Sequence, residues 1–359
     1  MMKEEYLVID GCRGEGGGQM LRASLALSMA LGKPFHMVNI RMKRVRPGLK
    51  RQHLTCVRAA QEICEAQVRG AEINACEIFF SPGEVRPGVY DIAVGTGGSV
   101  SLVLQALVPS LLFAEANSRL TVRGGTHVPY APPFEFMSET LFPCLEKLGP
   151  DLETHMERPG YMQMGGGVVH LSIHPARRSC TFDLTQSETP HEASAVIYGH
   201  NLPEGILERE TKVLMEQGSD LGLTENHISL IDGVHDRPCP IAVNGAGNMV
   251  LVKIRQGQRT TVFGECGWRG RSAEVVAGQA CKRAREYLRS GADVEACLSD
   301  QLLVPLALAG GGSFVTQRLT SHAATCLKII ELFTGQKAHT QHAGRNVVIT
   351  VPAAREETC

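Results

Sequence analysis

The sequence predicts a mixed α/β fold, with a large domain built from repeated units and a smaller α/β domain inserted into it. Glycine clusters stand at three places next to apolar segments and helix-like periodic runs, which is typical of a repeated supersecondary unit. The content of 43% hydrophobic and 20% charged residues is that of an ordinary globular α/β protein. A chain of 359 residues is long enough for roughly two to three domains of about 150 residues each.

The first unit begins with an apolar segment over residues 6–9, which we expect to form a strand. Glycines follow it, and the periodic run Leu21, Leu25 and Met29 then predicts a helix. A glycine loop before a helix N-terminus is typical of an anion site, because free φ angles and unpaired N–H groups both favour phosphate. The sequence of this glycine loop fits neither the Walker motif nor the dinucleotide-binding motif. On spacing alone, a helix-opening turn packed on a sheet is an equal alternative.

Proline signals complete the first unit and the second. Pro47-Gly48 introduces a predicted helix over 49–66, after the first helix and a strand. The second unit repeats this order, with a strand over 90–94, a glycine loop at 95–98, and helices over 102–112 and 134–148. The predicted unit is therefore β-α-β-α-β-β, with helices covering one side of a small sheet.

Residues 188–293 break this rhythm and predict a small inserted α/β domain. We expect strands over 193–198, 249–253 and 260–263, and helices over 203–218 and 272–290. The large domain then comprises residues 1–187 and a third unit within 294–359. In that unit we expect a strand over 302–309, a loop at Gly310 to Gly312, and a helix over 323–333.

Charge and cysteine usage narrow the setting. The formal net charge is −1, so any nucleic-acid contact must come from a local cluster. The segment 41–61 contains no acidic residue and carries Arg41, Lys43, Arg44, Arg46, Lys50, Arg51 and Arg58. Such a cluster can neutralise phosphates, although a solvated face or a nuclear-import signal would look similar. The 12 cysteines form no Cys-x-x-Cys pair, and we expect a cytoplasmic protein without a membrane segment.

Several motifs, in the same order along the chain, resemble those of bacterial RNA 3'-terminal phosphate cyclases. The resemblance covers nearly the whole chain. The motifs are Asp10-Gly-x-x-Gly-Glu15-Gly-Gly-Gly-Gln19-x-Leu-Arg22, Arg46-Pro-Gly-Leu-x-Arg-Gln-His53-Leu, Gly95-x-x-Gly-Ser99, Gly124-Gly-Thr126, Ala131-Pro-Pro133, Gly165-Gly-Gly167, Asp300-Gln301-Leu and Ser321-His322.

The resemblance implies three repeats like the C-terminal domain of translation initiation factor three, plus an inserted domain. It also implies ATP-dependent conversion of an RNA 3'-terminal phosphate to a 2',3'-cyclic phosphate, through an adenylyl-histidine and an RNA-adenylate anhydride, with release of pyrophosphate and AMP. The nucleophile falls on His322. Thr320 and Ser321 are N-cap candidates, so His322 is expected in the first helical turn, where the helix dipole disfavours imidazolium. The loop Gly310 to Gly312 would hold phosphates beside it.

The other implied site residues fall into three groups. Glu15 suits a divalent cation, Mg²⁺ or Mn²⁺, bound with ATP. Cations and polar groups expected on phosphates or RNA are Arg22, Arg41, Arg44, Arg51, Gln52 and His53. Residues expected around the nucleotide are Gln105, Pro132, Cys297, Leu298, Ser299, Asp300 and Gln301. Related cyclases often have a tyrosine on the adenine where this chain has Cys297, so we expect altered base packing, with Phe263 or Pro132 as the other wall.

Three alternatives remain at this point. Enolpyruvyl transferases stack similar repeats, but they give no reason for the motifs around His53 and His322. A non-catalytic cyclase-like protein that binds RNA in ribosome assembly would be expected to lack the histidine. His170 and His174 lie four residues apart and offer two metal ligands, too few for a structural zinc site. For His36, His127, His155 and His235 we expect surface or capping roles.

Overall fold

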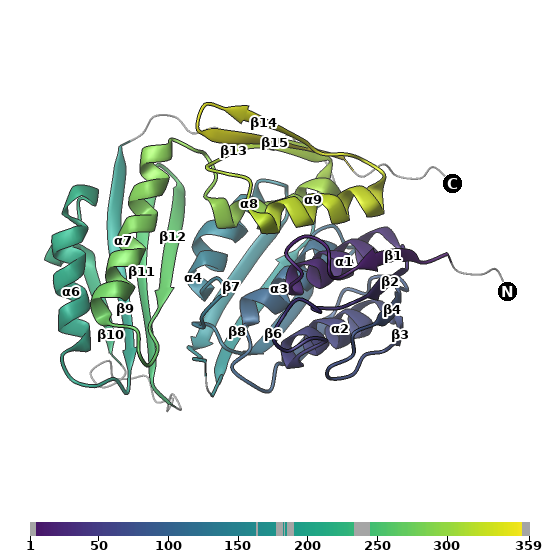
Figure 1. The fold of residues 1–359 in the computed structure, drawn as a ribbon, viewed down its shortest axis with the longest axis horizontal. Coiled ribbons are helices and arrows are strands. Elements are labelled where there is room, and N and C mark those ends of the chain that lie inside the picture. The colour runs from purple at the N-terminus through teal and green to yellow at the C-terminus, as the bar shows by residue number, and fades with distance from the viewer. Residues whose placement is uncertain are drawn as a thin grey trace.

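A computed structural model describes residues 5–162, 164–176, 182, 184, 190–232 and 245–353 (Figure 1). The expected domain boundary at 187/188 and the expected position of His235 lie outside these residues. The described chain is a mixed α/β fold, as expected, and its strands form four separate sheets. No helix among the described residues is both long and apolar enough to cross a lipid bilayer.

The first two units have the predicted order of elements. Their sheets are arranged identically, as β1-β2-β4-β3 and β5-β6-β8-β7, with the first two strands of each parallel. The first unit comprises β1 (Leu7–Asp10), α1 (Gly18–Leu31), β2 (Phe35–Val38), α2 (Arg51–Cys64), β3 (Gln67–Arg69) and β4 (Ile78–Ser81). The second comprises β5 (Val89–Ala93), α3 (Val100–Leu111), β6 (Ser118–Gly124), the helical run α4 (Phe134–Phe136), η1 (Met137–Leu141) and α5 (Phe142–Glu146), then β7 (Asp151–Arg158) and β8 (Gly167–His174).

The third unit differs from the prediction. It comprises α8 (Ala296–Ala309), β13 (Gly311–Thr316), α9 (Ser321–Thr334), β14 (His339–Ala343) and β15 (Asn346–Pro352), with sheet order β13-β15-β14. This order matches the last three strands of the other sheets. A single parallel bridge between Val294 and Thr316 stands where the first strand pairs with the second in the other units.

Two predictions for this unit are therefore wrong. The segment 302–309 is helical, because α8 is buried on nearly all sides and a uniformly apolar run does not distinguish a helix from a buried strand. The expected loop at Gly310 to Gly312 is replaced by the start of β13, where Gly311 pairs with Pro352 and Gly312 with Val351. Helix α8 begins at the N-cap Glu295, whose carboxylate accepts from the N–H groups of Cys297 and Leu298.

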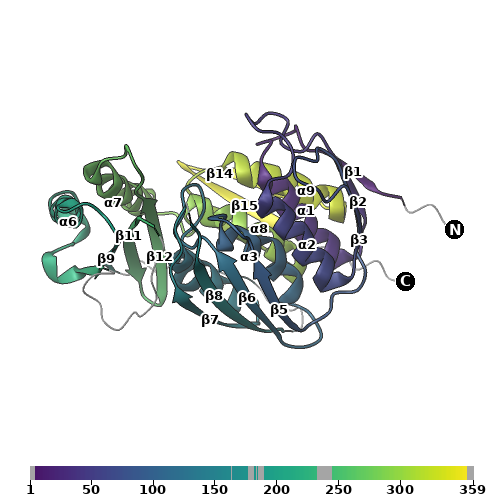
Figure 2. The same cartoon turned by 90° about the horizontal axis from the view of Figure 1, so that it is seen from below.

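The helices of the three units meet at the centre of the large body. Helix α1 contacts α2, α3, α8 and α9, and Figure 2 shows the three small sheets arranged around these helices. The shared core is mainly aliphatic. The N-termini of α1, α3 and α8 are thereby brought to neighbouring positions from three distant parts of the sequence.

The segment between these units forms a fourth sheet, and its predicted strands and helices are confirmed. The sheet order is β10-β9-β11-β12. Its elements are β9 (His191–His200), α6 (Ile206–Gln217), the short 3₁₀ turns η2 (Ser219–Leu221) and η3 (Glu225–His227), β10 (Ile228–Asp232), β11 (Gly247–Gln256), β12 (Arg259–Cys266) and α7 (Ala273–Ser290). The division of the chain at 187/188 and 293/294 stays a prediction.

Alternate residues of β11 face two different cores. Val250, Val252 and Ile254 pack in a separate core with α6 and α7, whereas Met249 and Leu251 join the core of the large body. This is the period of two that a strand imposes on its side chains. The sheet is therefore covered by helices on one face and by the large body on the other (Figure 1).

A buried polar cluster crosses the contact between this sheet and the large body. His127 is fully buried, and its Nε2 donates to both oxygens of Glu135, at 2.9 and 3.2 Å. Burial would raise the pKa of Glu135, but His127 and hydrogen bonds from His127 and from Tyr198 of β9 outweigh it and lower that pKa to about 2. The surface or capping role expected for His127 is therefore wrong.

Replacing Glu135 with alanine is expected to lower the free energy of unfolding by about 3 kcal/mol at pH 7, because His127 would lose its buried partner. The contribution of Glu135 is fully present above its ordinary pKa of 4.5 and is lost as the pH falls toward 2. Urea denaturation at pH 7 and at pH 3 measures this, with Glu135→Gln as the conservative control. Equal losses at both pH values would contradict the assignment of an ionised Glu135.

Candidate active site

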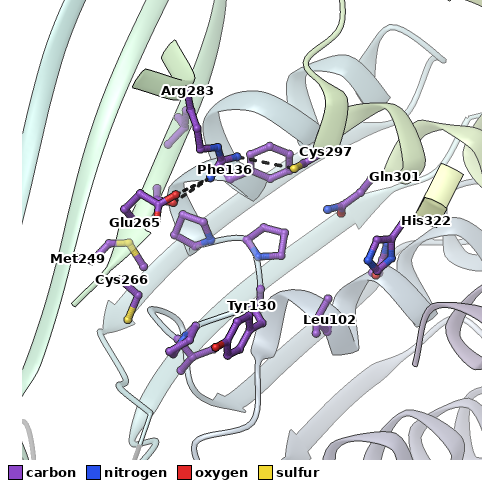
Figure 3. Close-up of a pocket in the computed structure, with 18 of the residues that line it drawn as sticks. Leu102, Tyr130, Phe136, Met249, Glu265, Cys266, Arg283, Cys297, Gln301 and His322 are labelled. Carbon is purple, nitrogen blue, oxygen red and sulfur yellow. Dashed lines mark hydrogen bonds and ion pairs between the residues drawn. The ribbon is translucent and has the colours of Figure 1, made fainter. Parts of the chain in front are cut away.

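The cavity of interest lies between the helices of the large body and the sheet β9–β12. It has a volume of about 560 Å³. Figure 3 shows His322 and Gln301 at one end, and Arg283, Glu265 and Cys266 at the other. The lining residues are Gln19, Arg22, Leu102, Gln105, Val128, Pro129, Tyr130, Ala131, Pro132, Pro133, Phe136, Met249, Val262, Gly264, Glu265, Cys266, Trp268, Arg271, Gln279, Arg283, Cys297, Asp300, Gln301 and His322.

His322 occupies the first turn of α9, as predicted. Thr320 is the N-cap, and its hydroxyl accepts from the N–H of Ala323 at 2.9 Å. The side chain of His322 is 45% exposed, so it borders the cavity and remains accessible to a ligand. Gly310 to Gly312 do not line the cavity, so the expected phosphate loop beside His322 is not formed by these residues.

The glycine loop before α1 brings Glu15 to the same place. Gly14 has a φ of +58°, and a Cβ there would lie 2.4 Å from Oγ1 of Thr325 in α9, so only glycine fits. The N–H of Glu15 donates to that same hydroxyl at 3.1 Å. The first unit and the third are therefore joined directly at this loop.

The carboxylate of Glu15 lies between a cation and the histidine. It forms an ion pair with Arg44, and its Oε2 lies 4.0 Å from Nδ1 of His322. This Oε2 is buried, and no described residue donates a hydrogen bond to it. A buried carboxylate oxygen without a donor is suited to a divalent cation, so Glu15 fits the metal-binding role implied by the sequence.

Arg22 supplies a buried positive charge to the cavity. It is 6% exposed, its Nε donates to Gln105 at 2.7 Å, and its Nη2 donates to Gln19 at 2.8 Å. Burial lowers the pKa of Arg22, and the nearby Asp300 and Glu15 counteract this. Two glutamines thus fix the guanidinium at the cavity wall, and a fixed planar guanidinium is suited to phosphate.

Asp300 faces this arginine from α8. Burial raises the pKa of Asp300 to about 8; Arg22 opposes the increase, whereas Glu295 and Glu15 add to it. At neutral pH the side chain is therefore mostly a neutral acid. In that form it can donate a hydrogen bond to a sugar or base, which an ionised carboxylate cannot do.

Replacing Asp300 with asparagine is expected to remove a pH-dependent destabilisation. A carboxyl group with a raised pKa favours folding while it is protonated and loses that advantage as the pH rises through the window from 3.8 to about 8. The loss is up to about 1.4 kcal/mol per pH unit. Melting temperatures of both proteins between pH 5 and pH 9 should diverge, with the variant more stable at alkaline pH. A constant difference would contradict the raised pKa.

The other residues expected around the nucleotide divide into two sets. Gln105, Pro132, Cys297 and Gln301 line the cavity with Asp300, and the buried Oε1 of Gln301 has no hydrogen-bond donor among the described residues. Leu298 and Ser299 are buried in α8 and do not line it. Phe263, expected as a wall, lies in the core under α7, with Arg283 over its ring.

The basic segment expected to bind phosphate lies beside the glycine loop, outside the cavity lining. Arg44 reaches Glu15, whereas Arg41 donates to the carbonyl oxygens of Arg46 and Gly48. Arg51 is exposed at the start of α2. The segment therefore presents cations to solvent next to Glu15 and His322.

Gln52 and His53 have structural partners. Gln52 Oε1 accepts from the N–H of Ser99 at 2.8 Å, and Nδ1 of His53 accepts from the N–H of Lys50 at 3.1 Å. Burial lowers the pKa of His53 to about 3, and the nearby Arg41, Arg22 and Lys50 add to the effect. His53 is therefore neutral at physiological pH.

His36, His155, His170 and His174 do not line the cavity. His36 pairs with Glu77 at 2.6 Å, and the ring of His155 lies 6.4 Å from that of His170. His170 also bonds to Glu157 at 2.9 Å and does not share a ligand cluster with His174. His174 groups instead with Asp151 and Glu153 at the surface.

Sequence reasoning missed the part of the cavity wall that comes from residues 249–283. Arg283 joins Glu265, at 3.2 Å, to Glu295, at 3.6 Å, and donates to the sulfur of Cys297 at 3.7 Å. Arg271 pairs with Glu265 at 2.7 Å. These are ordinary charged residues of a strand, a loop and a helix. The single tryptophan of the chain, Trp268, lines the cavity and could have drawn attention to this part of the sequence.

Comparisons with known proteins agree with these motifs. The family described as RNA 3'-terminal phosphate cyclase matches residues 13–340. An RNA 3'-terminal phosphate cyclase of Koribacter versatilis (strain Ellin345) is 42% identical over 91% of this chain and 89% of its own length. The proteins of the same name from Ectopseudomonas mendocina (strain ymp) and Salmonella enteritidis PT4 (strain P125109) are 41% and 40% identical, over 92% and 91% of this chain and 94% and 93% of their own lengths.

Proposed function

Because the chain belongs to the RNA 3'-terminal phosphate cyclase family, a family of ATP-dependent ligase-type enzymes, we propose that it cyclises RNA 3'-terminal phosphates through an adenylyl group carried on His322. The observation that supports this most is the position of His322, accessible at the cavity that also contains the buried cation Arg22.

The chemistry requires an activated phosphate. A phosphate monoester does not cyclise unaided, because the 2'-hydroxyl would have to expel an oxide ion from phosphorus, and oxide is too poor a leaving group. In the proposed sequence, a ring nitrogen of His322 attacks the α-phosphorus of ATP, forming a P–N bond and releasing pyrophosphate. An oxygen of the RNA 3'-phosphate then attacks the adenylyl phosphorus and displaces His322, which forms an anhydride between AMP and the RNA phosphate. Finally the 2'-hydroxyl attacks the terminal phosphorus, loses its proton, and expels AMP; the ribose already holds this hydroxyl in position.

The surroundings of His322 suit the first step. Glu15 lies on the Nδ1 side of the ring at 4.0 Å, which leaves Nε2 as the nitrogen available for attack. A neutral imidazole ring has a lone pair that can attack phosphorus. The divalent cation that we assign to Glu15 would neutralise charge on the triphosphate.

The remaining polar residues divide between the two substrates. We assign Arg22 and Gln105 to the phosphates of ATP, and Asp300, Gln301 and Cys297 to its sugar and base. Arg41 and the exposed Arg44 and Arg51 are assigned to the RNA backbone, because all three belong to the basic segment that reaches Glu15 through Arg44. Several cysteines, Cys56, Cys64, Cys281 and Cys326 among them, are buried core residues, which supports a reducing cytoplasmic setting.

Two measurements test the function. Purified protein is incubated with ATP and an oligoribonucleotide that carries a 3'-phosphate; conversion of that end to a phosphatase-resistant cyclic phosphate is expected, with a 3'-hydroxyl oligonucleotide as the control. Incubation with ATP labelled at the α-phosphate should give a covalent, acid-labile protein adduct. Absence of both products would refute the proposal and would favour a non-catalytic RNA-binding role.

A further inference from the structure

Tyr130 is an exposed aromatic residue in a strained backbone conformation. It is 95% exposed and has a φ of +62°, which bulky residues rarely adopt. It lies in the proline-containing loop between β6 and α4, and residues 128–133 of this loop line the cavity. A tyrosine in this exposed and strained position does not stabilise the fold. Its presence therefore indicates a contact with a bound ligand.

Trp268 lies beside Tyr130 at the lining of this cavity. It follows β12, is 38% exposed, and is the only tryptophan of the chain. The two ring centroids are 6.2 Å apart and the rings are tilted by 37°, so they are not packed face to face. The guanidinium of Arg271 lies 4.6 Å from the indole centroid and is held by Glu265 and by the carbonyl of Cys266. The indole is therefore supported while part of its surface stays open.

The two rings border the same cavity as His322 and come from two distant parts of the sequence, the loop between β6 and α4 and the segment after β12. An almost fully exposed ring cannot enclose a small nucleotide, so Tyr130 is poorly placed for the base of ATP. A strand that enters from solvent with its 3' end directed at His322 would pass this rim. Arg269, on the loop that carries Trp268, is exposed and adds positive charge there.

On this basis, and resting on the function proposed above, we propose that Tyr130 and Trp268 form a stacking platform for the terminal bases of the single-stranded RNA whose 3'-phosphate reaches His322. Stacking on aromatic rings is how proteins bind unpaired bases without reading their sequence. The platform would hold the RNA end while the phosphate is activated, with little preference for one base over another.

The single tryptophan makes the platform directly observable. Titration with a 3'-phosphorylated oligoribonucleotide should quench Trp268 emission, and the same oligonucleotide with abasic residues at its 3' end should quench it much less. A titration with ATP alone distinguishes binding of the ATP base to these rings from binding of RNA bases. Full quenching by ATP, with no further effect of RNA, would overturn the assignment to RNA.

Variants test the contribution to binding. Tyr130→Ala and Trp268→Ala are each expected to raise the KM for RNA by roughly 5- to 150-fold, the range for loss of one stacked base. The kcat and the yield of adduct from labelled ATP should not change. Tyr130→Phe and Trp268→Phe should restore binding, measured by anisotropy of a dye-labelled RNA. Met215→Ala removes an exposed apolar residue of α6, on the far side of the sheet, and is the matched control.

Tyr130→Gly adds a readout that is independent of activity. Glycine accepts the positive φ without strain, so this variant should melt at a higher temperature than the wild type while binding RNA weakly. Normal adduct formation together with unchanged RNA affinity in both alanine variants would overturn the platform and leave the proposed function intact. Loss of adduct in the wild-type protein would overturn the proposed function itself.

Discussion

Replacement of His322 with alanine is expected to abolish the covalent label from ATP and to lower the rate of cyclic phosphate formation by on the order of 10³-fold or more, as for other nucleophile deletions. The expectation follows from position. His322 lies in the capped first turn of α9, borders the cavity, and has Glu15 on one side of its ring. Labelled protein is separated after denaturation and counted, and cyclisation is followed on a 3'-phosphorylated oligonucleotide.

Two controls separate loss of the nucleophile from loss of the fold. His339→Ala removes an exposed histidine of β14, in the same unit, and should label normally. His322→Asn keeps a polar side chain at the start of the helix, and it should melt like the wild type but remain unlabelled. Retention of the label in His322→Ala would show that another residue carries the adenylyl group.

The parts of the fold that could be predicted were those bounded by turn and helix-capping residues in the sequence. Glycine and proline signals located the first two units, because tight turns and helix starts restrict residue choice at single positions. In the third unit the glycine cluster at 310–312 was misleading, because it leads into β13 and does not form the expected loop. Helix α8 is apolar on nearly all sides, since it is packed between the other helices, so no period marked it as helical. Its place in the repeat becomes clear only from the strand order β13-β15-β14.

The candidate site was predictable to the extent that its residues share short motifs. The family motifs pointed to Glu15, Arg22 and His322, which the fold brings to one region from opposite ends of the chain. The wall supplied by β12 and α7 could not be predicted, because Glu265 and Arg283 are 18 positions apart and join only when these two elements pack. Nor does sequence spacing show that Gln52 binds the backbone of Ser99.

Substitution of Arg22 has the second largest expected effect. Arg22→Met is expected to reduce the rate of adduct formation by about 10²- to 10³-fold, the range seen when a preorganised donor to a reacting oxyanion is removed. Arg22→Lys should recover only part of this loss. An ammonium group keeps the charge, but it cannot bind Gln105 and Gln19 in the fixed geometry of the guanidinium while also facing a phosphate. Single-turnover labelling with ATP, over a range of ATP concentrations, measures both affinity and rate.

Stability distinguishes this role from a structural one. Arg22 is a buried cation that has lost its hydration. Replacing such a residue with an apolar one of similar length often changes the free energy of unfolding little. The melting temperature of Arg22→Met should therefore stay close to that of the wild type while its activity falls. Arg58→Met, at an exposed arginine of α2, should change neither. If Arg22→Met instead unfolded in parallel with its loss of activity, the arginine would serve the packing of α1 against α3, and the phosphate contact would have to be assigned to another cation, with Arg44 beside Glu15 the first to test.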